Sequence, residues 1–111
     1  MTPEEAKMRL QARLAELDAE DAANADARET VELQQDSVGR LSRMDAMQQQ
    51  AMAQATARRR VAERARIAAA LLRIDEGEWG WCVSCGEEIA RRRLEHDPGV
   101  ATCLSCASAS T

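Results

Sequence analysis

The chain has 111 residues, of which 31 % are charged and 45 % are hydrophobic, and its formal net charge is −4. This length suits one domain or a small module with an arm, and the presence of only two aromatic residues, both tryptophan, excludes a core built on bulky rings. Because alanine carries much of the apolar content and has the highest helix propensity, the composition predicts closely packed helices rather than a sheet.

A first long helix is predicted from Pro3 to Val38, a stretch without glycine or a second proline. Thr2 is predicted to be its N-cap and Glu5 the partner in a capping box, with Pro3 at the first helical position. One ladder of three- and four-residue steps marks the predicted contact face: Leu10, Leu14, Leu17, Asp21, Asn24, Arg28, Val31, Gln35 and Val38.

A turn is predicted over residues 39–43, because Gly39 breaks the pattern and glycine often follows a helix end. A second ladder then predicts the contact face of a second helix: Met44, Met47, Ala51, Gln54, Arg58, Val61, Ala65, Ala68 and Leu72. Together the two ladders predict an antiparallel coiled-coil hairpin in which Leu10 faces Leu72 and Asn24 faces Arg58. Such a polar layer either fixes the register or is simply solvated.

Charge is distributed unevenly along the chain. Residues 1–35 hold nine acids and four bases, residues 36–74 three acids and eight bases, and residues 75–111 seven acids and three bases. We expect the basic residues Arg58, Arg59, Arg60, Arg64 and Arg66 to pair with the acidic first segment, the alternative being contact with nucleic acid. Because independent DNA binding needs a net basic face, we expect no direct DNA binding.

Four cysteines form two C-x-x-C pairs, Cys82 with Cys85 and Cys103 with Cys106, separated by seventeen residues. This spacing predicts one zinc ion, since two intervening residues let one tight turn direct two thiolates at the same metal. Gly86 is suited to the positive φ that such a turn often needs. Four sulfur ligands leave no open coordination position, so the predicted zinc is structural; the alternative is a pair of disulfides.

Several side chains around the cysteines have two interpretations. Trp79 and Trp81, just before the first pair, are predicted to be packing anchors at the junction of helix and finger rather than a pair that stacks on a ligand. His96 is predicted to be an exposed histidine and not a fifth ligand. Arg93 either braces the finger internally or, with its two arginine neighbours, meets an acidic partner.

The finger segment carries a specific combination of motifs. They are the lead-in Gly77-Glu78-Trp79-Gly80-Trp81-Cys82, the stretch Cys82-Val83-Ser84-Cys85-Gly86-Glu87-Glu88-Ile89, the pair Arg93-Leu94, Pro98, and the spacing of Cys103 and Cys106. This combination resembles the DksA/TraR family of zinc-finger proteins. The resemblance implies binding to RNA polymerase, with a coiled-coil tip inserted into the secondary channel of the enzyme and the finger as a structural base.

The resemblance also assigns partner binding to the hairpin tip. The best-known tip of the family reads Asp-x-x-Asp-x-Ala; here Asp36 matches the first acid, whereas Gly39 and Leu41 replace the second acid and the alanine. Asp45, followed by Ala46, is the other acidic candidate. The predicted tip set is Asp36, Gly39, Arg40, Leu41, Asp45 and Ala46. The alternative makes Asp36 a turn residue and Asp45 an acid that the helix dipole favours.

The sequence therefore predicts a mainly α protein: a helical hairpin over residues 1–75, with its tip near 36–46, followed by a four-cysteine zinc-finger module over residues 76–111. The predicted function is that of a monomeric, cytoplasmic transcription regulator that binds RNA polymerase. The alternative is a zinc-stapled helical adaptor for another protein, possibly a coiled-coil dimer. Asp97 stands where better-known family members present a base, so no dependence on guanosine tetraphosphate is predicted.

Enzymatic and membrane functions are not expected. The predicted zinc site has no open position, and no Cys/His nucleophile pair is evident around His96. The longest apolar run, from Ile67 to Leu72, is too short to cross a bilayer.

Overall fold

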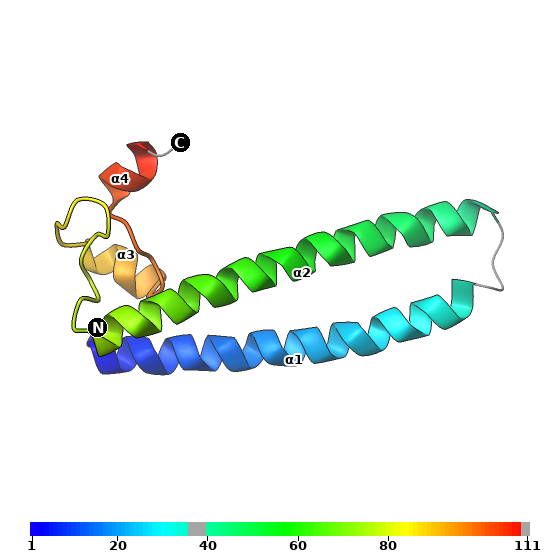
Figure 1. Cartoon of the computed structure of the whole chain (residues 1–111), viewed down its shortest axis with the longest axis horizontal. Coiled ribbons are helices and arrows are strands. Elements are labelled where there is room, and N and C mark those ends of the chain that lie inside the picture. Colours follow the sequence, from blue (N-terminus) through cyan, green and yellow to red (C-terminus); the bar gives the residue numbers. More distant parts are fainter. Residues whose placement is uncertain (36–39, 110–111) are drawn as a thin grey trace. The chain divides into compact units, whose positions relative to one another are not determined.

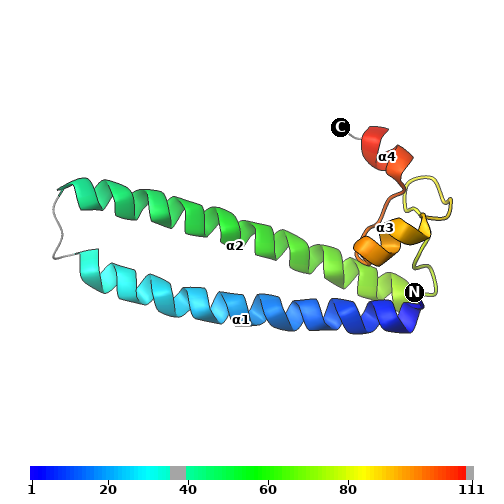
Figure 2. The ribbon, with the colours of Figure 1, turned by 180° about the vertical axis from the view of Figure 1, so that it is seen from behind.

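The protein is mainly helical, as predicted (Figure 1, Figure 2). The computed structural model describes the backbone of residues 1–35 and 40–109 and the side chains of residues 1–25 and 43–109. Its helices are α1 (Pro3–Gln35), α2 (Arg40–Asp75), α3 (Arg91–His96) and α4 (Leu104–Ala109). None of the helices within this described part combines the length and the apolar character that a membrane span requires.

Spatial contacts divide the chain into two compact units. One consists of Met1–Leu14 with Arg64–Thr111, and the other of Ala15–Glu63. In each unit a segment of α1 runs antiparallel beside a segment of α2 (Figure 1). The first unit thus joins one end of each long helix to the finger, whereas the division at residue 75 expected from the sequence remains a prediction.

The start of α1 follows the predicted capping box. The Glu5 backbone N–H donates to the hydroxyl of Thr2 at 3.2 Å, and the Thr2 backbone N–H donates to the carboxylate of Glu5 at 3.3 Å. These reciprocal bonds satisfy two donors that a helix start otherwise leaves unpaired. The prediction that α1 begins at Pro3 is therefore confirmed.

The predicted contact face of α1 is also confirmed where side chains are described. Leu10 and Leu17 are buried, with exposed fractions of 3 % and 0 %, and Leu14, Asp21 and Asn24 are half-buried. The remaining ladder positions, from Arg28 onward, lie outside the described side chains.

The predicted contact face of α2 is wrong. Met44, Met47, Val61 and Leu72 are 58–67 % exposed. The side chains that turn inward follow a different ladder and are buried or half-buried: Ala46, Ala53, Ala57, Arg60, Arg64, Ile67, Leu71 and Ile74. Because successive helical residues differ by about 100°, a ladder displaced by one residue faces a different direction. The predicted turn is also too long, since α2 already begins at Arg40.

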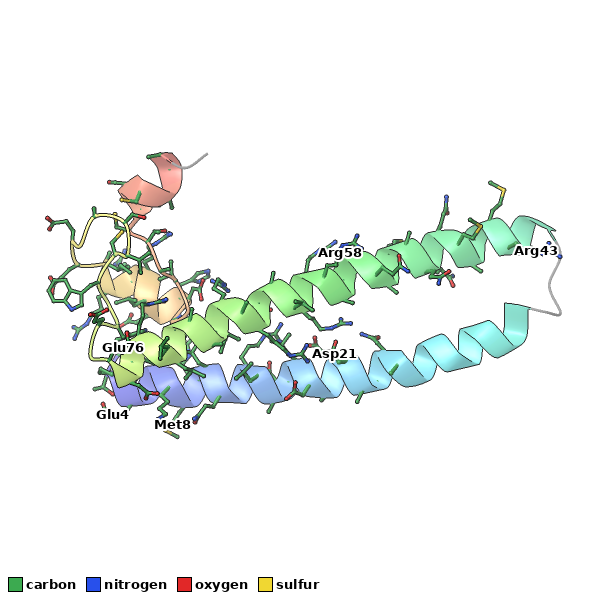
Figure 3. All side chains as sticks on the ribbon, viewed as in Figure 1. Glu4, Met8, Asp21, Arg43, Arg58 and Glu76 are labelled. Atoms are coloured by element: carbon green, nitrogen blue, oxygen red, sulfur yellow. The ribbon has the colours of Figure 1, made fainter. Side chains whose placement is uncertain are left out.

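The polar layer of the hairpin is an ion pair between Asp21 and Arg60. The Arg60 Nε donates to Asp21 Oδ1 at 2.5 Å, and Arg60 is only 7 % exposed. Figure 3 shows Asp21 between the two helices and Arg58 on the side of α2 that faces away from α1. The predicted pairing of Asn24 with Arg58 is therefore wrong. Arg60 does form an ion pair with the acidic first segment, as expected.

Candidate metal centre

A short hairpin after α2 positions the first cysteine pair. Trp81 and Glu88 form an antiparallel bridge, and the backbone N–H of Cys82 donates to the carbonyl of Glu87 at 2.8 Å. At the tip of this hairpin, Gly86 adopts a φ of 78° and donates its N–H to the Cys82 carbonyl at 2.9 Å. A residue with a side chain rarely adopts this φ, so glycine at this position favours the tight turn that aims two thiolates the same way.

The second cysteine pair lies at the start of α4. Cys103 directly precedes the helix and Cys106 lies in its first turn. The backbone N–H of Cys106 faces the sulfur of Cys103 at 3.5 Å. The backbone N–H of Val83 donates a hydrogen bond to the carbonyl of Ala101 at 2.9 Å, which holds this segment beside the first hairpin.

The four sulfur atoms have the spacing of a tetrahedral zinc site. All four Sγ atoms, from Cys82, Cys85, Cys103 and Cys106, lie within 4.8 Å of one another. Zn–S bonds of about 2.3 Å in a tetrahedron place sulfur atoms about 3.8 Å apart, and the Sγ atoms of Cys85 and Cys103 are 3.8 Å apart. All four cysteines are free rather than disulfide-bonded. The donor set therefore fits one structural Zn2+, with every tetrahedral position taken by sulfur.

The electrostatics of the cluster also favour a bound cation. Hydrogen bonding from the backbone of Cys103 lowers the pKa of Cys82 to about 6. In contrast, the thiols of Cys103 and then Cys85 raise the pKa of Cys106 to about 12. Four thiolates this close repel one another, so full ionisation needs the positive charge of a metal ion.

Zinc affinity is expected to rise with pH. The raised pKa of Cys106 means that zinc must displace its proton at neutral pH, and below about pH 6 Cys82 holds a proton as well. Each proton released on binding changes the affinity roughly tenfold per pH unit. Competition with a chromophoric chelator between about pH 8 and about pH 5 measures this slope. A pH-independent affinity would contradict the assignment of thiolate ligands.

The finger is built around the ligands themselves. Cys82, Ile89 and Leu94 are buried together, and the partly buried residues packed against them are Trp79, Val100, Cys103 and Cys106. The Trp79 Nε1 donates to the carbonyl of Pro98 at 2.9 Å, which confirms Trp79 as a packing anchor. Trp81 is 48 % exposed, so the same prediction is wrong for Trp81.

The structure decides between the two interpretations of Arg93 and of His96. Arg93 is half-buried, and its Nε donates to the carbonyl of Thr102 at 2.9 Å, so it braces the finger internally. His96 is exposed at the end of α3, as expected, and is not among the four clustered ligands.

Three contacts tie α3 and the loop after it to the long helices within the same compact unit. Arg9 Nη1 donates to the carbonyl of Glu95 at 2.7 Å, and Arg66 Nη1 pairs with Asp97 Oδ2 at 2.5 Å. Gly99 is buried so close to Leu10 that an added Cβ would lie 3.6 Å from a leucine methyl. Sequence reasoning placed Arg66 against the acidic first segment; its partner Asp97 was missed because no local pattern links residues 31 positions apart.

The predicted tip residues fall partly outside the described structure. Asp36 and Gly39 lie outside the described residues, and Arg40 and Leu41 belong to the first turn of α2 without described side chains. Asp45 is exposed on α2 and Ala46 is half-buried beside it. Their role in partner binding remains a prediction.

Comparison with known proteins agrees with this arrangement. Residues 77–111 match the family model described as the prokaryotic dksA/traR C4-type zinc finger. A segment of 41 residues is 44 % identical to the RNA polymerase-binding transcription factor DksA of Haemophilus influenzae; it covers 37 % of this chain and 28 % of that protein. The structure of transcription factor DksA2 from Pseudomonas aeruginosa superposes with a TM-score of 0.82 at 21 % identity, over 97 % of this chain and 81 % of that one.

Proposed function

We propose that this chain is a member of the prokaryotic dksA/traR C4-type zinc finger family, whose model residues 77–111 match, and that it is a transcription regulator that acts by binding RNA polymerase. In this proposal the protein works in the cytoplasm as a monomer and recognises protein rather than DNA. The zinc ion is structural, and the hairpin tip is the part that acts on the polymerase.

The observation that carries the proposal is the C4 finger, whose curated relative is named an RNA polymerase-binding transcription factor. Over 97 % of its length, the chain has the fold of transcription factor DksA2. Charge supports contact with protein, since residues 75–111 hold seven acids and three bases and would repel a phosphate backbone. A zinc site closed by four thiolates supports a binding role rather than catalysis.

We assign the contact with the polymerase to the tip near residues 36–46, with Asp36 and Asp45 as its acids. A carboxylate brought close to a catalytic Mg2+ or to its carboxylate ligands perturbs their charge at short range. This gives an acidic tip in the secondary channel a physical means of altering promoter complexes.

The double substitution Asp36→Asn, Asp45→Asn is expected to weaken the effect of the protein on in vitro transcription by roughly tenfold, since a lost charged contact costs about 1.5–3 kcal/mol. Both substitutions keep the side-chain shape and remove only the charge. The matched control is Glu4→Gln, Glu76→Gln, which removes two exposed acids outside the tip. If the control variant loses as much of its effect on transcription, the net charge of the protein and not its tip is responsible.

Retention of zinc-loaded protein by purified RNA polymerase core enzyme tests the proposal itself. We expect a stable complex that forms without DNA. A chain that holds zinc but is not retained by the polymerase would overturn the proposed function.

A further inference from the structure

Trp81 is an exposed tryptophan on the surface of the finger and lies outside its buried core. Trp79 supplies the anchor to Pro98, whereas Trp81 is 48 % exposed and its neighbour Val83 is 61 % exposed. Cys82 lies between them and is buried. Trp81 and Val83 line the same hollow of the surface. An exposed tryptophan beside other apolar surface is typical of an interaction site, where tryptophan often contributes most of the binding energy.

Two hollows in the finger surface flank this tryptophan. One has a volume of about 480 Å3, and Trp81 lines it together with Trp79 and Glu88. The other has a volume of about 450 Å3, and Trp81 lines it together with Glu78 and Val83. The indole therefore stands between two recesses, each with a glutamate in its wall, and a partner side chain has room beside it.

The backbone places Glu88 next to the indole. Trp81 and Glu88 are opposite residues of an antiparallel bridge, and such residues extend their side chains from the same face with Cβ atoms about 4.5–5.5 Å apart. Glu88 is exposed, and within the described residues no ion pair is recorded for its carboxylate. The pair thus combines an aromatic face with an available negative charge.

The segment that carries the pair is acidic. Residues 76–90 contain four exposed glutamates, Glu76, Glu78, Glu87 and Glu88, and no basic residue. Two cations do line the same hollow as Glu88, namely Arg91 and the amino terminus at Met1, and the latter already faces the carboxylate of Glu95 at 3.9 Å. In the other hollow, Arg73 is half-buried and points a guanidinium nitrogen at the carbonyl of Val100, 3.5 Å away.

We propose that the Trp81–Glu88 pair receives an arginine or lysine side chain from a basic surface of RNA polymerase. The indole face attracts a cation through its quadrupole, and the carboxylate pairs with the same charge. Because the carboxylate of Glu88 lies beside the indole, the pair itself favours a cationic side chain over a phosphate group, although Arg91 lines the same hollow. This inference rests on the proposed function and adds to it a second contact, made by the finger rather than by the tip.

Retention on immobilised polymerase core enzyme, measured as an apparent Kd, tests the proposal. Trp81→Ala is expected to weaken binding about tenfold, as loss of an interfacial tryptophan commonly does, and Glu88→Gln about threefold. The matched control is Glu87→Gln, which removes the same charge one position away, where alternation directs the side chain to the other side. It should change the Kd less than about twofold, in keeping with its place outside the pair.

Salt dependence provides a second readout. Glu88→Gln should flatten the dependence of the Kd on ionic strength more than Glu87→Gln does, because the former removes a direct ion pair. Zinc content and helical circular dichroism establish that each variant is folded. If Trp81→Ala loses zinc, the proposal is tested by comparing the Kd values of Glu88→Gln and Glu87→Gln. Failure of the unsubstituted protein to bind overturns the proposed function, whereas normal binding with equal Kd values for all folded variants overturns only the Trp81–Glu88 site.

Discussion

Chelation of zinc is expected to unfold the finger over residues 77–109 while most of the helical circular dichroism persists. Three of the ligands, Cys82, Cys103 and Cys106, belong to the small core of the finger, and structural zinc in small fingers contributes on the order of 10 kcal/mol at neutral pH. Without the metal, that core retains only Ile89 and Leu94 as its buried apolar residues, too few to offset the entropy of ordering the loop.

The compact units extend this expectation to parts of the long helices. Met1–Leu14 and the end of α2 from Arg64 belong to the same unit as the finger. Arg9 donates a hydrogen bond to Glu95 in α3, and Arg66 donates one to Asp97 just after that helix. Amide hydrogen exchange should therefore accelerate most in residues 77–109 and also increase in these helix ends.

Two substitutions of similar size separate the role of the metal from that of the surrounding chain. Cys85→Ser removes a ligand and should reproduce the effect of chelation, whereas Ser84→Ala, at the adjacent exposed position, should not. Unchanged thiol reactivity and unchanged exchange in the finger after chelation would show that zinc does not hold this module together.

Asp21→Ala is expected to lower the free energy of unfolding by about 2 kcal/mol. The substitution leaves Arg60, only 7 % exposed, without the carboxylate that it contacts at 2.5 Å. Breaking a fully buried pair costs about 3–5 kcal/mol. The smaller expected value reflects the 35 % exposure of the Asp21 side chain, which lets water screen the charges.

The double variant Asp21→Leu, Arg60→Leu distinguishes this explanation from a simple loss of contact. Replacing a buried ion pair by apolar residues is often neutral or stabilising, so the double variant should recover most of the lost stability. Arg59→Ala, at the adjacent exposed position, is the control and should change stability by less than about 0.5 kcal/mol. Urea unfolding followed by circular dichroism measures all three. A double variant less stable than Asp21→Ala would mean that the pair itself holds the helices together.

Features set by short stretches of chain could be predicted from the sequence. The capping box from Thr2 to Glu5 spans four residues, and each C-x-x-C pair also spans four, the first in a tight turn and the second at the start of α4. In both cases the required geometry follows from bonds between near neighbours. The same holds for Gly86, whose positive φ is a property of its own backbone.

The inward face of α2 depended on interactions that no local pattern contains. Alanine occurs on every side of this helix, so ladders one residue apart differ little in the apolar area that they bury. The methionines at 44 and 47 suggested one ladder, yet the buried ladder contains Arg60, whose desolvation is offset by Asp21 on the other helix. Hydrophobic pattern alone does not reveal a buried charge whose partner is distant in sequence.

Two other features also depend on contacts between residues distant in sequence. They are the exposure of Trp81 and the contacts that join the finger to the long helices. Trp79 and Trp81 have the same residue type and nearly the same neighbours, and only the path of the folded chain brings Pro98 to one of them. The pairing of Arg66 with Asp97 likewise requires the finger to fold back on α2. The primary structure thus specified the zinc ligands, because the two cysteines of each C-x-x-C pair are near neighbours in the chain. The tertiary structure selected the helix face and the free tryptophan, because those depend on energy differences between distant partners.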